Sequence, residues 1–207
     1  MSQNSPFRGA LNVPNLLTSL RLVLAIILFL VIGIAQSPAT EAAARSTLYW
    51  SGLILFAVAA GTDWVDGYWA RKYGQVTVVG RIFDPFVDKV IICGAFIFLV
   101  GSDHSGIAPW MAVVVTAREL LVTALRSFFE QHGTDFSAKM AGKLKMVLQC
   151  VAVLASLYLL ATIGDAGPTV GLARTVQIIL WATILLTLYS GAEYVLAAWR
   201  LAKKSVG

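Results

Sequence analysis

The chain has 207 residues, of which 58% are hydrophobic and only 13% are charged. This composition exceeds what the core of a water-soluble protein requires, so it excludes an ordinary soluble domain and indicates an integral membrane protein. The formal net charge of +5 suits a surface of anionic membrane lipids, and with so little polar surface we expect no nucleic-acid partner.

Six apolar segments are each long enough for a helix that crosses a bilayer, which needs about 20 residues. Short connections rich in Gly, Pro, Ser and Asp separate them. We therefore expect an all-α fold with one domain over residues 1–207, a polytopic membrane bundle of six transmembrane helices. The segments lie near residues 15–35, 47–71, 82–101, 107–129, 142–163 and 169–200.

The first segment has a second interpretation as a secretory signal. A basic residue precedes its apolar run, and small residues follow in AQSPA. However, the polar stretch PNLLTSLR leads straight into the run, and the segment is long enough to span a bilayer. A retained transmembrane helix is therefore favoured.

Lys and Arg are distributed unevenly between the two sides of the predicted bundle. The side with more of them is expected to be cytoplasmic, which places both termini in the cytoplasm. The opposite connections hold only Arg45 and Arg174, whereas the cytoplasmic side holds Arg8, Arg71, Lys72, Arg81, Lys139, Lys143, Lys145, Arg200, Lys203 and Lys204.

The stretch GTDWVDGYWAR places acidic residues at the end of an apolar segment. Asp63 and Asp66 are three positions apart on the second predicted helix, and Asp84 and Asp88 are four apart on the third, so each pair shares a helix face. Since the connection is short, antiparallel packing should bring all four carboxylates together on the cytoplasmic side. Pro85 is expected in the first turn of the third helix. If Asp84 instead caps that helix, its side chain points in a different direction from Asp88.

Four ionised carboxylates so close together repel one another and need bound cations. Oxygen ligands select hard cations, and two divalent ions, Mg²⁺ or Mn²⁺, would balance the four charges. Such a pair of metals assists phosphoryl displacement. Two alternatives remain: an ion or proton site of a transporter, and solvated helix ends paired with basic neighbours. Those neighbours are Arg71, Lys72, Arg81 and Lys89.

The complete pattern D-x2-D-G-x2-A-R-x8-G-x3-D-x3-D, from Asp63 to Asp88, resembles the signature of the CDP-alcohol phosphotransferases at every defined position. The resemblance implies a six-helix membrane enzyme with two metals, which transfers a substituted phosphate group from a CDP-linked donor to an alcohol and releases CMP. It also implies that Asp63, Asp66, Asp84 and Asp88 hold the metals. Asp88 would in addition be the catalytic base that takes the proton of the acceptor hydroxyl.

The same resemblance suggests how the donor nucleotide is bound. Small residues of the motif would leave room for the cytidine and ribose, and Arg71 would contact the nucleotide or hold a carboxylate in place. In PNLLTSLR, Asn15, Thr18 and Arg21 recur at helical spacing and could contact the donor diphosphate or cap the helix. The predicted donor-binding residues are Asn15, Thr18, Asp66, Gly67, Ala70, Arg71 and Gly80.

Three further stretches, NVPNLLTSLR, TARELLVTALR and GKLKM, resemble the bacterial members of the family whose donor is CDP-diacylglycerol and whose acceptor is glycerol 3-phosphate. This likeness implies phosphatidylglycerophosphate as the product and the bacterial inner membrane as the location, with the active site facing the cytoplasm. Inositol phosphate or serine is the alternative acceptor.

Arg118 is a cation about midway along an apolar helix, where it needs an anion or a cavity. Glu119 follows directly but should point about 100° away, which makes it a poor partner. An acceptor phosphate is therefore expected at Arg118. The other predicted acceptor-binding residues are Arg126, Lys139, Lys143 and Lys145, although the lysines could instead attract anionic lipid headgroups.

The last two apolar segments show no catalytic constellation, and their expected roles are structural. They could close the bundle, line an opening for the acyl chains, or form the face of a homodimer. Gly191 and Glu193 are their unusual features.

Overall fold

The structure is a computed structural model that describes residues 13–73, 78–131, 140–163 and 167–206. Within this part, residues 63–73, 78–82 and a few other positions are described by their backbone alone. The predicted all-α fold is confirmed for the described chain. Its helices are α1 (Val13–Ala35), α2 (Ala42–Tyr73), α3 (Val78–Val100), α4 (Pro109–Gln131), α5 (Met140–Thr162) and α6 (Val170–Val206).

The start of α3 differs from the prediction. The helix begins at Val78, so Pro85 lies inside it and not in its first turn, and Asp84 is not a cap. A proline inside a helix leaves a carbonyl without its donor, but long apolar helices tolerate this where neighbouring groups compensate. The carbonyl that Pro85 leaves without a donor is the one four residues earlier, whereas the carbonyl of Pro85 itself accepts from Lys89 Nζ at 2.9 Å. Because the helix is continuous through Asp84 and Asp88, the two carboxylates share one face.

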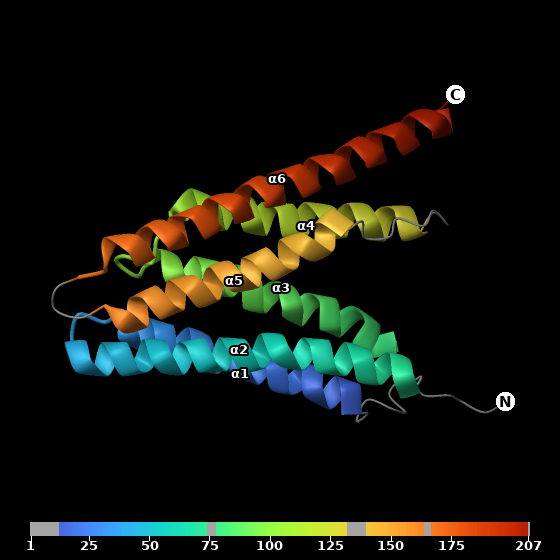
Figure 1. Cartoon of the computed structure of the whole chain (residues 1–207). Coiled ribbons are helices and arrows are strands. Elements are labelled where there is room, and N and C mark those ends of the chain that lie inside the picture. The colour runs from blue at the N-terminus through green and yellow to red at the C-terminus, as the bar shows by residue number, and fades with distance from the viewer. Residues whose placement is uncertain (1–12, 74–77, 132–139, 164–166, 207) are drawn as a thin grey trace.

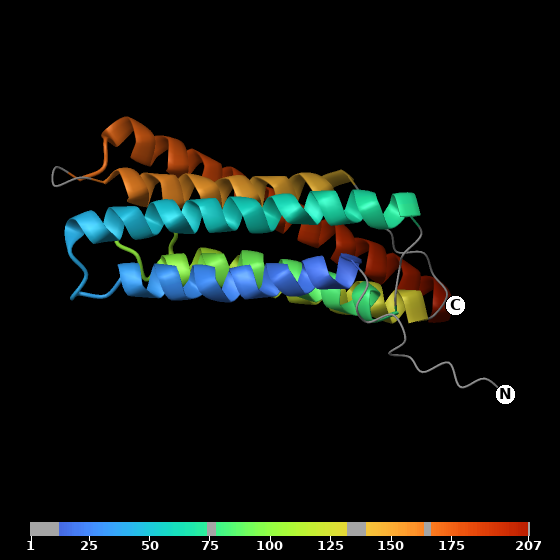
Figure 2. The ribbon, with the colours of Figure 1, turned by 90° about the horizontal axis from the view of Figure 1, so that it is seen from below.

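Successive helices run in opposite directions along an elongated bundle (Figures 1 and 2). One end, here called the motif end, therefore holds the starts of α1, α3 and α5 and the ends of α2, α4 and α6. The other ends of the helices lie at the opposite end. Helix α1 packs along both α2 and α3, which contact each other over a much shorter stretch, and α5 packs against α2 and α6. Helix α4 lies against α3 and α6.

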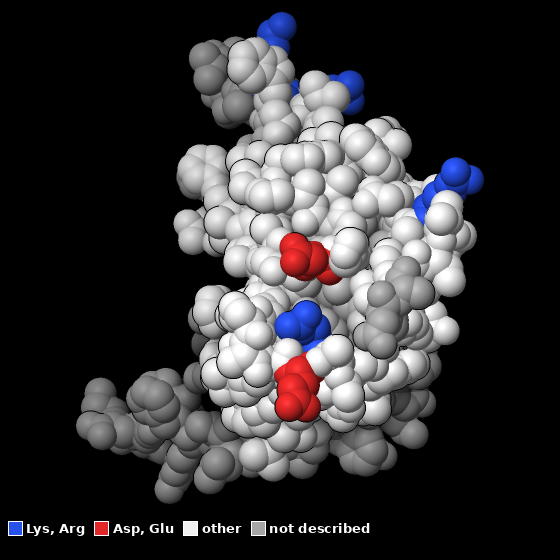
Figure 3. Space-filling model, turned by 90° about the vertical axis from the view of Figure 1, so that its left-hand side faces the viewer, with Lys and Arg blue, Asp and Glu red and all other residues white. Residues whose placement is uncertain are grey.

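Apolar side chains fill the interior and also cover the outside. Phe56, Phe96 and Leu157 are fully buried, whereas Ile178 and Trp199 are 69% and 74% exposed. Contiguous apolar surface of this kind is unfavourable in water but suits contact with lipid tails. Seen from the opposite end, the surface carries few charged side chains (Figure 3).

In the described part of the chain, four helices contain segments long and apolar enough to cross a membrane: 15–35, 42–62, 144–162 and 170–201. Helices α3 and α4 have the required length but carry more charge, including Asp84, Asp88 and Lys89 in α3 and Arg118, Glu119 and Arg126 in α4. The charged residues that keep α3 and α4 from qualifying as membrane spans by composition are therefore the ones that make up the candidate site.

Candidate active site

The carboxylates of α3 are held by a buried arginine from α1. Arg21 is 1% exposed, and its Nη1 lies 2.5 Å from Asp88 Oδ1 and 3.3 Å from Asp84 Oδ1. The hydroxyl of Thr18, one turn earlier, donates to Asp84 Oδ1 at 3.1 Å. Since two nearby carboxylates repel each other, the positive charge of Arg21 stabilises the pair. The PNLLTSLR stretch thus faces the acidic motif.

Helix α1 begins at Val13, and this corrects one interpretation of its polar residues. Asn15 and Thr18 lie inside the helix, so neither of them is its cap, and the Asn15 carbonyl accepts from the Ser19 hydroxyl at 2.9 Å. Both side chains are buried. Thr18 already contacts one carboxylate of the acidic motif.

The second half of the acidic motif is only partly described. Asp63 and Asp66 lie in the last part of α2, which runs toward the motif end, where α3 begins (Figure 1). Their side chains lie outside the described part of the structure, as do those of Gly67, Ala70, Arg71, Gly80 and Lys143. Lys139 lies outside it altogether.

The described carboxylates suit a divalent metal in their chemistry. Asp84 and Asp88 offer hard oxygen ligands, and their side chains are 42% and 26% exposed, so ions can reach them. Among the side chains that the structure describes, no three His, Cys, Asp or Glu residues lie close enough to hold an ion. A complete metal site would therefore need ligands from α2, as the motif predicts.

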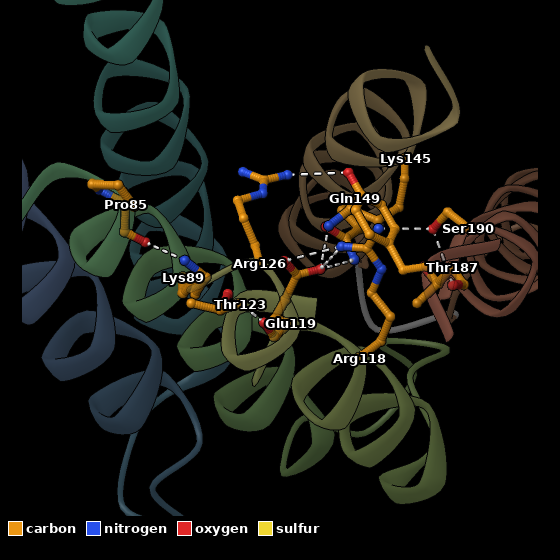
Figure 4. Close-up of polar contacts among 11 residues, drawn as sticks. Pro85, Lys89, Arg118, Glu119, Thr123, Arg126, Lys145, Gln149, Thr187 and Ser190 are labelled. Atoms are coloured by element: carbon orange, nitrogen blue, oxygen red, sulfur yellow. Dashed lines mark hydrogen bonds and ion pairs between the residues drawn. The ribbon is translucent and has the colours of Figure 1, made fainter. Parts of the chain in front are cut away.

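A second polar cluster lies where α4, α5 and α6 meet (Figure 4). Its centre is the buried carboxylate of Glu119, whose Oε1 accepts a short hydrogen bond from Lys145 Nζ. Arg118 Nη1 lies 3.4 Å and Gln149 Nε2 lies 3.5 Å from the same oxygen. Glu119 thus brings one negative charge to two cations, Arg118 and Lys145, and an excess of positive charge remains.

The expectation that Glu119 is a poor partner for Arg118 is wrong, because the two side chains form an ion pair at 3.4 Å. Neighbouring residues of a helix do point about 100° apart, but both side chains are long enough to bend toward each other across the helix surface. Arg118 is only 9% exposed, so its pairing with Glu119 offsets part of the cost of burying it.

Helix α6 supplies further contacts to the arginines of this cluster. Ser190 Oγ accepts from Arg118 Nη2 at 3.0 Å, and the Tyr194 hydroxyl accepts from Arg126 Nη2 at 3.1 Å. The Nε atoms of both arginines are buried and have no hydrogen-bond partner among the described residues. An unsatisfied buried donor is costly, and a bound anion could satisfy both of these donors.

The two clusters lie on neighbouring helices, because α3 packs against α4. Lys89, next in sequence to Asp88, lies within electrostatic range of Asp88, Glu119 and Arg126 (Figure 4). Acidic residues that could bind a metal and basic residues that could bind an anion thus occupy neighbouring parts of one site.

A cavity of about 950 Å³ lies elsewhere in the described chain. It opens at the opposite end of the bundle, and its lining includes Gln36, Arg45, Tyr49 and Ser102. None of the predicted site residues lines it. We therefore place the candidate site by its chemistry and not by cavity size.

The sequence did not reveal several residues of this site. Glu119, Gln149, Ser190 and Tyr194 were not predicted to belong to it, and Arg21 was predicted to contact the donor or cap its helix, with no prediction that it would meet carboxylates. One signal was available in the sequence: Ser190 and Tyr194 are four positions apart, so they share a face of their helix. Nothing in the sequence alone shows that this face of α6 contacts Arg118.

Comparison with known proteins agrees with this chemistry. The family model described as CDP-alcohol phosphatidyltransferase matches residues 11–189. Proteins named CDP-diacylglycerol–glycerol-3-phosphate 3-phosphatidyltransferase are similar to the chain: one from Bacillus subtilis (strain 168) is 38% identical over 94% of this chain and 98% of its own. The protein of that name from Escherichia coli (strain K12) is 31% identical over 90% of this chain and 94% of its own. A probable phosphatidylglycerophosphate synthase from Mycobacterium tuberculosis (strain ATCC 25618 / H37Rv) is 36% identical, over 91% of this chain and 82% of its own.

These relatives are named as enzymes and not as transporters, which removes support from the transporter interpretation of the acidic motif. The family match spans the helices that carry both the acidic and the basic cluster. The chain belongs to the CDP-alcohol phosphatidyltransferase family.

Proposed function

We propose that this enzyme transfers the phosphatidyl group of CDP-diacylglycerol to glycerol 3-phosphate, giving phosphatidylglycerophosphate and CMP. The observation that carries the choice of acceptor is the basic cluster of α4 and α5, with its two buried guanidinium Nε donors. A phosphate monoester fits such a cluster, since guanidinium groups match phosphate oxygens in charge and geometry. The names of the similar proteins favour glycerol 3-phosphate among phosphate-bearing acceptors.

The reaction needs a proton acceptor for the attacking alcohol. The hydroxyl oxygen of the acceptor would form a bond to the phosphorus that bears diacylglycerol, while the bond from this phosphorus to the bridging oxygen breaks and CMP leaves with that oxygen. Asp88 would take the hydroxyl proton, as the last carboxylate of the motif. Arg118, Arg126 and Lys145 would hold the acceptor phosphate, with Lys139 and Lys143 as further basic residues.

The family is known to use divalent cations. We propose Mg²⁺ or Mn²⁺, two ions, with Asp63, Asp66, Asp84 and Asp88 as their ligands. When bound, the ions would neutralise the diphosphate and make CMP a better leaving group. Arg21 and Thr18 would keep Asp84 and Asp88 in position for this role. Asn15, Gly67, Ala70, Arg71 and Gly80 would line the donor nucleotide site.

An acceptor panel tests the proposed function. Purified enzyme with CDP-diacylglycerol should release CMP fastest with glycerol 3-phosphate, and kcat/KM for glycerol should be lower by about 10- to 150-fold because its phosphate contact is missing. Serine should be equally poor, and inositol phosphate is the competing phosphate-bearing acceptor. A higher kcat/KM for inositol phosphate or serine than for glycerol 3-phosphate would contradict the assignment.

We also propose that all six helices span the membrane and that the motif end faces the cytoplasm. Three features support this orientation: the helices alternate in direction, both described chain ends lie at the motif end (Figure 1), and most Lys and Arg belong to it. The substrate glycerol 3-phosphate is a cytosolic anion, so the basic cluster would face its supply.

Cysteine labelling tests this topology. In a variant whose Cys93 and Cys150 are replaced by alanine, a cysteine at Asp103 should react with a membrane-impermeant maleimide in intact cells. A cysteine at Asp135 should react only after the cells are opened. The reverse labelling pattern would place the motif end outside the cytoplasm.

A further inference from the structure

One face of α6 contacts the arginines of α4 through three residues. Ser190 and Gly191 are buried, and Tyr194, one turn later, is 5% exposed. The outward face of that helix presents large side chains that are mainly apolar, among them Leu185, Leu188 and Tyr189. The buried face therefore differs in chemistry from its lipid-facing surroundings.

Ser190 acts as an acceptor for Arg118. Its hydroxyl donates to the Thr187 carbonyl at 3.2 Å, which uses its one proton and leaves its lone pairs available. Arg118 Nη2 donates to this oxygen at 3.0 Å. Because Ser190 donates its proton within α6, its oxygen acts as the acceptor toward Arg118.

Gly191 makes room for the stem of the same arginine. A Cβ atom added at Gly191 would lie 3.2 Å from Arg118 Cγ, closer than ordinary van der Waals contact. The aliphatic part of the Arg118 side chain lies against α6 at Gly191, where the helix has no side chain. Any larger residue would have to displace the arginine or the helix.

Tyr194 contacts both arginines. Its ring centroid lies 5.7 Å from Arg118 Cζ and 5.9 Å from Arg126 Cζ, distances at which a guanidinium is attracted to an aromatic ring. Its hydroxyl accepts from Arg126 Nη2 at 3.1 Å. One side chain thereby sets the positions of two cations that are eight residues apart in α4.

We propose that Ser190, Gly191 and Tyr194 form an arginine cradle, which positions Arg118 and Arg126 for the acceptor phosphate. The inference rests on the proposed function and gives α6 a part in the recognition of the acceptor. The cradle engages Nη2 of each arginine, while each Nε keeps no partner among the described residues. It therefore holds the two guanidinium groups in place without occupying all of their donors.

The test compares substitutions in the cradle with matched substitutions elsewhere on α6. Tyr194→Phe removes the hydroxyl that accepts from Arg126 and keeps the ring, so KM for glycerol 3-phosphate should rise about 3- to 10-fold. KM for CDP-diacylglycerol should stay within about twofold, since one lost hydrogen bond acts only locally. Tyr194→Leu, which also removes the ring, should raise KM for glycerol 3-phosphate further than Tyr194→Phe does. Gly191→Ala should likewise raise KM for glycerol 3-phosphate.

The controls are Tyr189→Phe, on the lipid-facing surface, and Gly171→Ala, where an added Cβ meets nothing within 4 Å.

Thermal unfolding in detergent and calorimetric titration with glycerol 3-phosphate accompany the kinetics. Tyr194→Phe should unfold within a few degrees of the wild type and still bind glycerol 3-phosphate more weakly. If Tyr194→Phe and Gly191→Ala behave like their controls, or weaken both substrates equally, the cradle is refuted. If the wild type neither binds nor uses glycerol 3-phosphate, the proposed function has failed and the cradle fails with it.

Discussion

Asp88→Asn is expected to lower kcat by about 10²- to 10⁴-fold, the usual contribution of a general base. Asparagine has nearly the same shape, but it cannot accept the acceptor's proton and it is a weaker ligand for a cation. Arg21 would lose one of its charged partners, so thermal unfolding must be measured together with CMP release. Asp84→Asn should also reduce turnover strongly, because it removes one of the predicted metal ligands.

Asp103→Asn is the matched control, because Asp103 is exposed in the α3–α4 connection at the opposite end. A chelator should abolish wild-type turnover, and added Mg²⁺ or Mn²⁺ should restore it. Calorimetry with Mn²⁺ alone gives a readout independent of activity, and Asp84→Asn should bind the ion more weakly. Wild-type activity that persists in the chelator would contradict a metal role for these carboxylates, and normal turnover of Asp88→Asn would contradict its role as the base.

Arg118→Lys is expected to raise KM for glycerol 3-phosphate by about 10- to 150-fold, which corresponds to the loss of a charge-assisted contact. Lysine keeps the charge but has no planar set of donors. It therefore cannot bind Glu119 and Ser190 as the guanidinium does and still present a donor to a phosphate. Arg118→Ala should lose most of the activity. The KM for CDP-diacylglycerol should change much less in the lysine variant.

Arg174→Lys is the control for this change, because Arg174 is an exposed arginine near the start of α6. Initial rates of CMP release with each substrate varied in turn give the two Michaelis constants. An equal rise for both substrates would show that Arg118 stabilises the bundle and does not select the acceptor. No change in either constant would place the acceptor pocket elsewhere.

Hydrophobic pattern was sufficient to predict the helices, because each span needs about 20 apolar residues and the connections carry turn-forming residues. The ends of the helices were harder to predict where a residue type occurs both in the first turn of a helix and inside one. Pro85 is typical of a first turn, but α3 begins at Val78 and continues through it. Local propensity cannot decide such a case, since the packing of neighbouring helices determines whether a proline is tolerated.

The site could be predicted only as far as contacts within one helix determine it. The spacing of Asp84 and Asp88 implied a shared face, and both carboxylates meet Arg21. The partners themselves are distant in the sequence: Arg118 and Ser190 are 72 residues apart, and Arg126 and Tyr194 are 68 apart. No periodicity in a single helix indicates which face of another helix it will meet. The full four-aspartate site stays a prediction, because the side chains of Asp63 and Asp66 lie outside the described part of the chain.

The polar contacts of the two clusters come from different halves of the sequence. Arg21, Thr18, Asp84 and Asp88 belong to α1 and α3, whereas Glu119, Lys145, Ser190 and Tyr194 belong to α4, α5 and α6. On the proposed function, the first half performs the reaction and the second half chooses the alcohol. Gene duplication followed by divergence of the second half could then produce a new lipid headgroup without rebuilding the reaction. A hybrid gene that joins the first half of this chain to the second half of a relative with another acceptor should accordingly inherit the acceptor of that relative.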